Sequence, residues 1–370
     1  MKVHYNYLPQ EFAETSAIFD EWRILIESSD FTLGFYVEEF EKEFAKFAGV
    51  KHCVATNNGT DALILALKSI GVGTNDEVIT VTNSFYATAG AIVAVGAIPV
   101  LVDCDDRFQI CPKAIQSAIT KKTKAILPVH WGGASPAIET ILELASTYNL
   151  EIIEDACMGI GGSVGGKHPG SFGRVSAFSM HPLKSLNVMG DGGMVVTNDS
   201  DLNDWMRKYR NHGMISRDTI EFWGVNMRLQ PLQAIVAKQR LQVLDETISK
   251  RNRNAKYLDE NLSKLSKYVQ LPNRIDTNVE TFALYMGLFE NRDRLKKFLK
   301  ENNVEVKIHY PKPLHIQPAA QKSCIMGEKL TNSEYQAERL LTLPVHQYLD
   351  IQHMKYVCET IFAFYGYEDG

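Results

Sequence analysis

The sequence predicts an α/β protein with a large domain, built on a mainly parallel seven-stranded sheet between helices, and a smaller C-terminal α+β domain. Two observations support this fold class. Short apolar runs of strand length recur between residues 52 and 197, and helix-like segments separate the earlier ones, which is typical of a parallel sheet covered on both faces. Beyond residue 200, long helical segments and a few strand-like pieces follow. We therefore place the domain boundary near residue 245, giving domains 1–245 and 246–370.

The individual elements follow from the spacing of apolar residues. Residues 10–47 are expected to form two helices around a loop at 28–35. The seven expected strands are 52–56, 77–82, 98–102, 124–129, 151–154, 175–180 and 193–197, and the helices between the earlier ones are 60–70, 86–96, 112–120 and 135–148. We interpret 229–262 as a long helical spine interrupted by the charged segment 250–253. Later strands are expected at 268–271, 282–289 and 304–309, and later helices at 291–302 and 351–364.

Composition excludes several classes of function. The chain has 370 residues and a net charge of −5, which gives no electrostatic reason to expect nucleic acid as a partner. No run approaches the roughly 18 apolar residues of a membrane-spanning helix, and no secretory signal is visible at the N-terminus. The six cysteines are scattered without a CxxC pair, so we expect reduced thiols, no metal site and a cytoplasmic location.

The candidate site residues follow the expected strands, because ligands of open α/β sheets bind at the carboxyl ends of the strands. After these strands come Asn57-Asn58-Gly59-Thr60, Ser84-Phe85-Tyr86, His130-Trp131, Glu154-Asp155 and Ser179-Met-His181-Pro-Leu-Lys184. Each of these segments has two explanations, one purely structural and one that involves a ligand. The glycine and threonine either cap a helix or bind a phosphate. Asp155 pairs either with an arginine or with a protonated ring nitrogen, and Lys184 is either a solvated loop lysine or a desolvated nucleophile.

Taken together, these residues match one cofactor. A phosphate cradle, an aromatic plate, a carboxylate and a nucleophilic lysine are the four contacts that pyridoxal 5′-phosphate (PLP) requires. The ordered set of motifs, from Asn58-Gly59-Thr60-Asp61-Ala62-Leu63 through Phe178-Ser-Met-His-Pro-Leu-Lys184 and Gly190-Asp-Gly-Gly193 to Leu341-Thr-Leu-Pro344, resembles the DegT/StrS family across nearly the whole chain. These proteins are fold-type I, PLP-dependent aminotransferases that act on keto sugars, usually attached to a nucleotide.

The resemblance implies roles for individual residues. Lys184 would form the Schiff base and move the proton, Asp155 would pair with the pyridine nitrogen, and Phe85 would stack on the ring. Gly59, Thr60 and Ser179 would hold the phosphate. Asn226 would reach the cofactor phosphate of a neighbouring subunit, which implies a homodimer with shared active sites. His181, His309 and Tyr310 would lie near the sugar, and an amino acid such as glutamate would supply the amine.

The sequence departs from the family pattern at Met158. Family members usually carry glutamine or histidine there, in contact with the phenolic oxygen of the cofactor, whereas a thioether donates no hydrogen bond. Either another group, with His130 and Asn187 as the candidates, replaces this contact, or the lysine-bound cofactor titrates differently. The segment Asn187-Val-Met-Gly-Asp191 also differs from the commoner pattern, which indicates a subgroup with its own substrate geometry.

Three other functions compete with amino transfer to a 3-keto or 4-keto sugar. A PLP- or pyridoxamine-dependent sugar dehydratase is disfavoured by Lys184, because such relatives carry histidine there. An NAD-dependent reductase or epimerase would need a GxGxxG turn after the first strand, where this chain has Asn-Asn-Gly-Thr. A non-catalytic regulator with the same fold is disfavoured by the presence of both Lys184 and Asp155.

Overall fold

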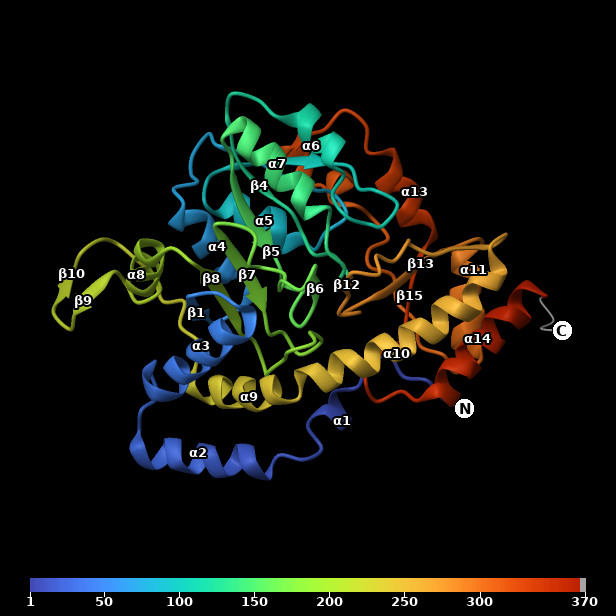
Figure 1. Cartoon of the computed structure of the whole chain (residues 1–370), viewed down its shortest axis with the longest axis horizontal. Coiled ribbons are helices and arrows are strands. Elements are labelled where there is room, and N and C mark those ends of the chain that lie inside the picture. The colour runs from blue at the N-terminus through green and yellow to red at the C-terminus, as the bar shows by residue number, and fades with distance from the viewer. Residues whose placement is uncertain (367–370) are drawn as a thin grey trace.

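The core of the molecule is an eight-stranded sheet (Figure 1). The computed structural model describes residues 1–366. In spatial order the strands are β1 (His52–Thr56), β8 (Gly193–Thr197), β7 (Val175–Ser179), β5 (Glu151–Asp155), β4 (Thr123–Leu127), β2 (Glu77–Val81), β3 (Ile98–Val102) and β14 (Ile325–Met326). Strand β8 is antiparallel to both of its neighbours, and the other pairs are parallel. The predicted mainly parallel sheet is confirmed, with β14 as an eighth strand that the sequence did not indicate.

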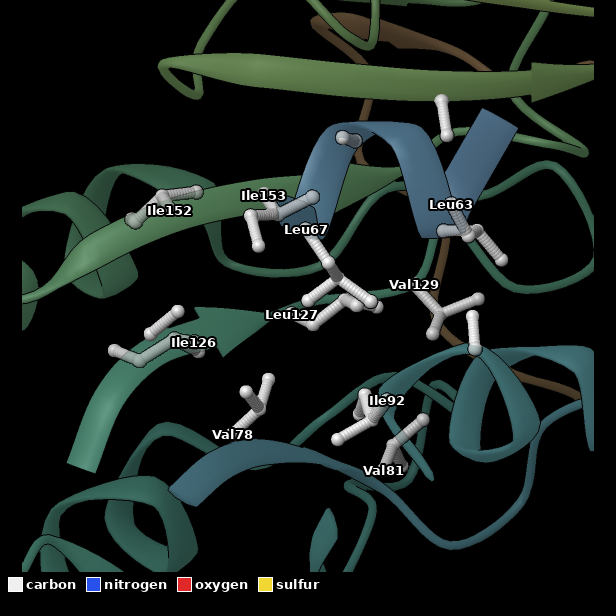
Figure 2. Packing of buried hydrophobic residues seen from close by; sticks show 14 of the residues in the cluster. Leu63, Leu67, Val78, Val81, Ile92, Ile126, Leu127, Val129, Ile152 and Ile153 are labelled. Atoms are coloured by element: carbon white, nitrogen blue, oxygen red, sulfur yellow. The ribbon is translucent and has the colours of Figure 1, made fainter. Parts of the chain in front are cut away.

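Both faces of the sheet are buried, because successive side chains of a strand point to opposite faces. In β1, Val54 belongs to the same core cluster as Leu63 of α4 (Gly59–Ser69), whereas Cys53 and Ala55 belong to a second cluster with Phe44 of α3 (Gly34–Ala48). Figure 2 shows the first cluster, in which side chains of α4 meet those of β2, β4 and β5. Helices therefore cover the sheet on both sides, and polar side chains gather at its ends.

Of the remaining helices around this sheet, four lie close to their predicted positions and the one at 231–242 is part of the expected spine, whereas those at 8–11 and 200–209 were not predicted. These remaining helices are α1 (Leu8–Glu11), α2 (Ser16–Ser28), α5 (Tyr86–Ala94), α6 (Pro112–Ala118), α7 (Ile138–Tyr148), α8 (Ser200–Tyr209) and α9 (Pro231–Gln242). Short strand pairs connect β6 (Ser163–Val164) with β12 (Asn278–Val279) and β9 (Met214–Ser216) with β10 (Thr219–Ile220). The β9–β10 hairpin projects from the body of the molecule (Figure 1).

The C-terminal part has its own core. Strands β11 (Val269–Gln270), β13 (Tyr285–Phe289) and β15 (Leu340–Leu343) form an antiparallel sheet. The helices of this part are α10 (Leu244–Leu262), α11 (Arg292–Glu301), α12 (Ala320–Ser323), α13 (Thr331–Arg339) and α14 (Ile351–Tyr365). The N-terminal segment joins it, since Val3 forms a parallel bridge with Val304. The domain boundary near 245 stays a prediction.

Two predicted elements differ from the structure. The expected spine at 229–262 is two helices, α9 and α10, which meet at Val243, and the charged segment 250–253 lies inside α10. Its polarity does not interrupt the helix, because straight-chain basic residues have good helix propensity. The expected strand at 304–309 forms isolated bridges, Val304 with Val3 and Lys307 with Thr342, instead of a continuous strand.

Candidate active site

A cavity of about 390 Å³ lies where the predicted site residues meet. Nine of the ten line it: Gly59, Thr60, Phe85, Asp155, Ser179, His181, Lys184, His309 and Tyr310. The tenth, Asn226, is exposed and does not line the cavity; it forms a bridge with Asn211, and its side-chain oxygen accepts a hydrogen bond from Arg228 Nε at 3.0 Å. The structure therefore gathers residues from β1, β2, β5 and β7 at one end of the sheet, as the topology of parallel strands requires.

Lys184 is held in the loop that follows β7. Its carbonyl oxygen accepts hydrogen bonds from Tyr7 Oη at 3.2 Å and Asn187 Nδ2 at 3.1 Å, which fix the backbone at this position. Burial lowers the pKa of the Lys184 amine, and the neighbouring Cys157 and Asp155 oppose this shift in part. A lysine amine with a lowered pKa is available as a nucleophile more often than a solvated one. Lys184 is thus not an ordinary solvated lysine.

Asp155 ends β5 as a buried carboxylate. Its oxygens accept hydrogen bonds from Thr88 Oγ1 at 2.8 Å and from the Cys157 backbone N–H at 3.3 Å. Among residues 1–366 it forms no ion pair, so the structural pairing with an arginine, which the sequence left open, is absent from this part of the chain. Because burying a carboxylate without a cation is costly, the arrangement suits a positively charged group in the cavity.

The start of α4 forms a cradle next to β7. Asn58 caps the helix by accepting a hydrogen bond from the Asp61 backbone N–H at 2.8 Å. The backbone N–H groups of Gly59 and Thr60 have no acceptor among the described residues, as expected in a first helical turn. A Cβ at Gly59 would lie 2.6 Å from Ser179 Cβ, so only glycine allows this close approach. Free N–H groups and a hydroxyl at a helix N-terminus are suited to a phosphate.

Aromatic side chains surround the cavity opening. The Phe85 side chain is 44% exposed although it lines the cavity, and its ring lies 6.2 Å from that of Tyr310. Tyr310 also lies 5.8 Å from the ring of Trp131, which is buried. An exposed aromatic face at this place can stack on a flat heterocycle.

The two histidines predicted near the substrate differ in environment. His181 is exposed, and burial of part of its ring together with the charge of Lys184 lowers its pKa. His309 is half-buried and its Nδ1 lies 3.0 Å from Thr342 Oγ1. Burial, together with the positive charges of Lys307 and Lys184, lowers the pKa of His309 to about 4. His309 is therefore a neutral imidazole near pH 7.

Neither group suggested as a replacement at Met158 enters the cavity. The buried His130 bonds to Ser135 Oγ at 2.9 Å through Nδ1 and to Glu154 Oε2 at 2.8 Å through Nε2. Asn187 donates to Glu11 Oε1 and to the carbonyl of Lys184, both at 3.1 Å. Both suggestions were wrong as to position, because each side chain is engaged in the structure outside the cavity. Met158 itself lines it.

Sequence reasoning missed a second part of the lining. Tyr5 and Tyr7 come from the N-terminal segment, Arg251 from α10, Phe282 from the segment before β13, and His346 from the segment after β15. We call these residues, with His309, the assembled wall, and the set Gly59, Thr60, Asp155, Ser179 and Lys184 the strand-end wall. The only sequence signal for the assembled wall is the His309-Tyr310 motif, because its other members do not follow a strand of the large sheet.

Comparison with known proteins identifies the family. The model of the DegT/DnrJ/EryC1/StrS aminotransferase family matches residues 13–362. The chain belongs to this family. It is 37% identical to the "Pleiotropic regulatory protein" of Geobacillus stearothermophilus (95% of this chain and 94% of that one). It is 35% identical to the "UDP-2-acetamido-2-deoxy-3-oxo-D-glucuronate aminotransferase" of Pseudomonas aeruginosa (91% and 93%).

A solved structure of an aminotransferase supports the same assignment. DesV of S. venezuelae, solved in complex with a ketimine intermediate, has a TM-score of 0.95 at 32% identity and covers 100% of both chains. The predictions of a fold-type I aminotransferase with PLP as its cofactor are confirmed, because they are properties of this family. Within residues 1–366, no helix is both long and apolar enough to cross a membrane.

Proposed function

We propose that this aminotransferase transfers an amino group from an amino acid, with glutamate as the first candidate, to a 3-keto or 4-keto sugar carried by a nucleotide. One observation carries the chemistry: a lysine amine with a lowered pKa and a buried carboxylate without an ion pair line the same cavity. The relative from P. aeruginosa, whose name specifies a 3-oxo sugar attached to UDP, supports the substrate class. This reaction contributes to the synthesis of amino sugars and of polysaccharides that contain them.

The strand-end wall and Phe85 are suited to hold PLP. The N–H groups of Gly59 and Thr60 and the Ser179 hydroxyl bind the phosphate, Asp155 keeps the ring nitrogen protonated, and Phe85 covers the ring. The bound cofactor supplies an electron sink for the amino transfer. Lys184 would hold the cofactor through its amine, and as a free amine it would accept and return the proton during amino transfer.

The decisive experiment replaces Lys184. The Lys184→Ala protein should lose both the yellow absorbance of the lysine-bound cofactor and turnover, and an active variant would refute the proposal. The substrate class is tested by loading the enzyme with pyridoxamine phosphate and adding keto sugars, free and nucleotide-linked. Return of the absorbance of the aldehyde form identifies a substrate. His181, His309 and Tyr310 are proposed to contact the sugar, so their variants should raise KM for the sugar.

We also propose a homodimer with shared sites. Asn226 does not line the cavity of its own subunit. The nearby β9–β10 hairpin and the segment after it carry exposed apolar side chains, with Ile215 57%, Ile220 44% and Trp223 87% exposed. Large exposed apolar side chains on a projecting element are typical of an interface. Mixing Lys184→Ala with Asn226→Ala protein should restore activity if the subunits exchange, because one site of each mixed dimer then carries neither substitution. If the subunits are shown to exchange and activity is still not restored, the shared site is contradicted.

A regulatory role is the second candidate, since one relative carries the name "Pleiotropic regulatory protein". The same Lys184→Ala protein separates the two functions, because a regulator that does not use catalysis would keep its biological effect. Lys184 likewise disfavours the dehydratase. A cytoplasmic location stays a proposal, supported by six cysteines that are all unpaired.

A further inference from the structure

Arg251 is a buried cation in the assembled wall without an acidic partner. Its side chain belongs to α10, is among the largest fully buried ones, with an exposure of 2%, and lines the cavity. Among residues 1–366, no carboxylate forms an ion pair with it. Burying a guanidinium without a counter-charge costs free energy, so its environment needs an explanation.

The other two buried arginines differ in this respect. Arg210 pairs with Glu41 at 2.5 Å, and Arg292 pairs with Asp293 at 2.7 Å. Neither lines the cavity. The two buried arginines away from the cavity thus each have a carboxylate partner, a buried one for Arg210 and an exposed one for Arg292, whereas Arg251 faces the cavity and has none among the described residues.

The hydrogen bonds of Arg251 lead only to neutral groups. Nε donates to Gln347 Oε1 at 3.0 Å, Nη2 donates to Tyr7 Oη at 2.9 Å, and Nη1 makes longer contacts with Ser185 Oγ at 3.4 Å and the Phe282 carbonyl at 3.3 Å. A guanidinium has five N–H groups, so one N–H on Nη2 has no acceptor among the described residues.

A carboxylate does lie nearby, but it is already bound. Glu11 accepts hydrogen bonds from Arg240 Nη2 at 2.7 Å and from Gln347 Nε2 at 2.6 Å. Gln347 thus lies between Glu11 and Arg251. It donates a hydrogen bond to Glu11 and accepts one from Arg251. This arrangement holds the guanidinium in place without neutralising its charge.

We propose that Arg251 binds the α-carboxylate of the amino-acid donor. Arginine is well suited to carboxylates, because its planar donors match both oxygens. Its position is suitable, since Tyr7 Oη bonds both to Arg251 Nη2 and to the carbonyl of Lys184. A donor held there presents its amine to the part of the cavity where Lys184 acts. The inference rests on the proposed amino transfer and adds the group that recognises the donor.

The test compares donors on the cofactor-loaded enzyme. In single-turnover measurements of the donor half-reaction, the wild type should prefer L-glutamate over its α-amide, L-isoglutamine, by at least about 30-fold, since losing one partner of a buried charged pair is costly. It should discriminate less against the γ-amide, L-glutamine. Equal use of glutamate and isoglutamine by the wild type would overturn the inference without any variant.

The Arg251→Gln variant then assigns the preference to this residue. It should use glutamate and isoglutamine about equally, whereas the sugar half-reaction of the pyridoxamine-loaded variant should stay within about threefold of wild type. A purely structural role would weaken both half-reactions together and keep the preference, which would overturn the inference. If wild-type enzyme performed neither half-reaction, the proposed function itself would fail, which is a distinguishable result.

Two further variants control for stability. Arg292→Gln removes a buried arginine outside the cavity, so it should lower the melting temperature and leave the donor preference unchanged. Arg251→Lys keeps the charge without the planar donors and should retain part of the donor preference. It takes the place of Arg251→Gln as the test if that variant does not fold. A complete loss of preference in Arg292→Gln, or an unchanged one in Arg251→Lys, would count against Arg251 as the binding residue.

Discussion

The strand-end wall and the assembled wall of the cavity differ in how the chain builds them. The strand-end wall consists of residues that end strands of one sheet or follow them within a few positions, such as Asp155 at the end of β5 and Gly59 after β1. The assembled wall combines the N-terminal segment, α10 and the C-terminal part, with Tyr7, Arg251 and His346 as examples. Backbone topology fixes the first wall, whereas hydrogen bonds between distant side chains fix the second. We therefore expect substitutions in the first wall to affect cofactor chemistry. Substitutions in the second wall should affect substrate binding, at Arg251 that of the donor and at His309 that of the sugar.

The largest effect should come from the strand-end wall. Asp155→Asn removes the charge of the buried carboxylate but keeps its size, so kcat/KM should fall roughly 10²–10³-fold, as expected for loss of a buried charged pair. Thr88→Val removes the hydroxyl that donates to the Asp155 carboxylate and bonds to Ser84 Oγ, both at 2.8 Å, but leaves the charge of Asp155 in place. It should cost less, about 10-fold. Steady-state kinetics checks both. A loss below tenfold in Asp155→Asn would show that this carboxylate does not act on the cofactor.

A second substitution tests the phosphate cradle. Gly59→Ala places a methyl group 2.6 Å from Ser179 Cβ, which forces α4 and β7 apart, and the dissociation constant of PLP should rise by about 10-fold or more. Titration of cofactor-free protein by absorbance measures this constant. Gly73→Ala is the matched control, because a Cβ there meets nothing within 4 Å. Equal affinities of the two variants would mean that the cradle does not hold the phosphate.

A smaller effect is expected in the assembled wall. Tyr7→Phe removes the hydroxyl that accepts a hydrogen bond from Arg251 Nη2 and donates one to the carbonyl of Lys184. The neutral bond contributes about 1 kcal/mol, and the bond from the guanidinium contributes at least as much. The donor half-reaction should slow by about 5–10-fold, with the PLP affinity unchanged. Tyr356→Phe is the control, since its hydroxyl bonds to the Asn302 carbonyl outside the cavity. A weaker PLP affinity in Tyr7→Phe would break the division between the two walls.

A last prediction concerns the pH dependence of stability and not turnover. His346 is buried, its Nε2 lies 3.0 Å from the His4 carbonyl, and burial lowers its pKa from 6.5 to about 4. The unfolded chain binds a proton below pH 6.5 that the folded protein takes up only near pH 4, so the free energy of unfolding falls as the pH falls through this range. Between pH 7 and pH 5, denaturant unfolding should show a loss that is about 2 kcal/mol larger in the wild type than in His346→Gln. Equal losses in both proteins would contradict this assignment.

The same division explains what the sequence could predict. All seven strands and the strand-end residues were identified, because an apolar run followed by a polar residue has a local signature. The assembled wall has no such signature. Arg251 lies in the charged segment 250–253, which was interpreted as an interruption of the helix, and its hydrogen bonds lead to Gln347 and Tyr7, far away in the sequence. The two-residue strand β14 was missed for a related reason, since so short an element carries no periodicity.

Strand β14 has a consequence for experiments on fragments. Ile325 and Met326 pair with Val100 and Leu101 of β3, and the Gly327 N–H donates to the Leu101 carbonyl at 2.7 Å. The edge strand of the eight-stranded sheet next to β3 is thus supplied by residues far beyond position 245. A truncated protein ending there would leave β3 with bare backbone donors and acceptors, and such uncovered edges recruit other chains. Separating the halves by truncation should therefore yield aggregates in place of a soluble cofactor-binding unit.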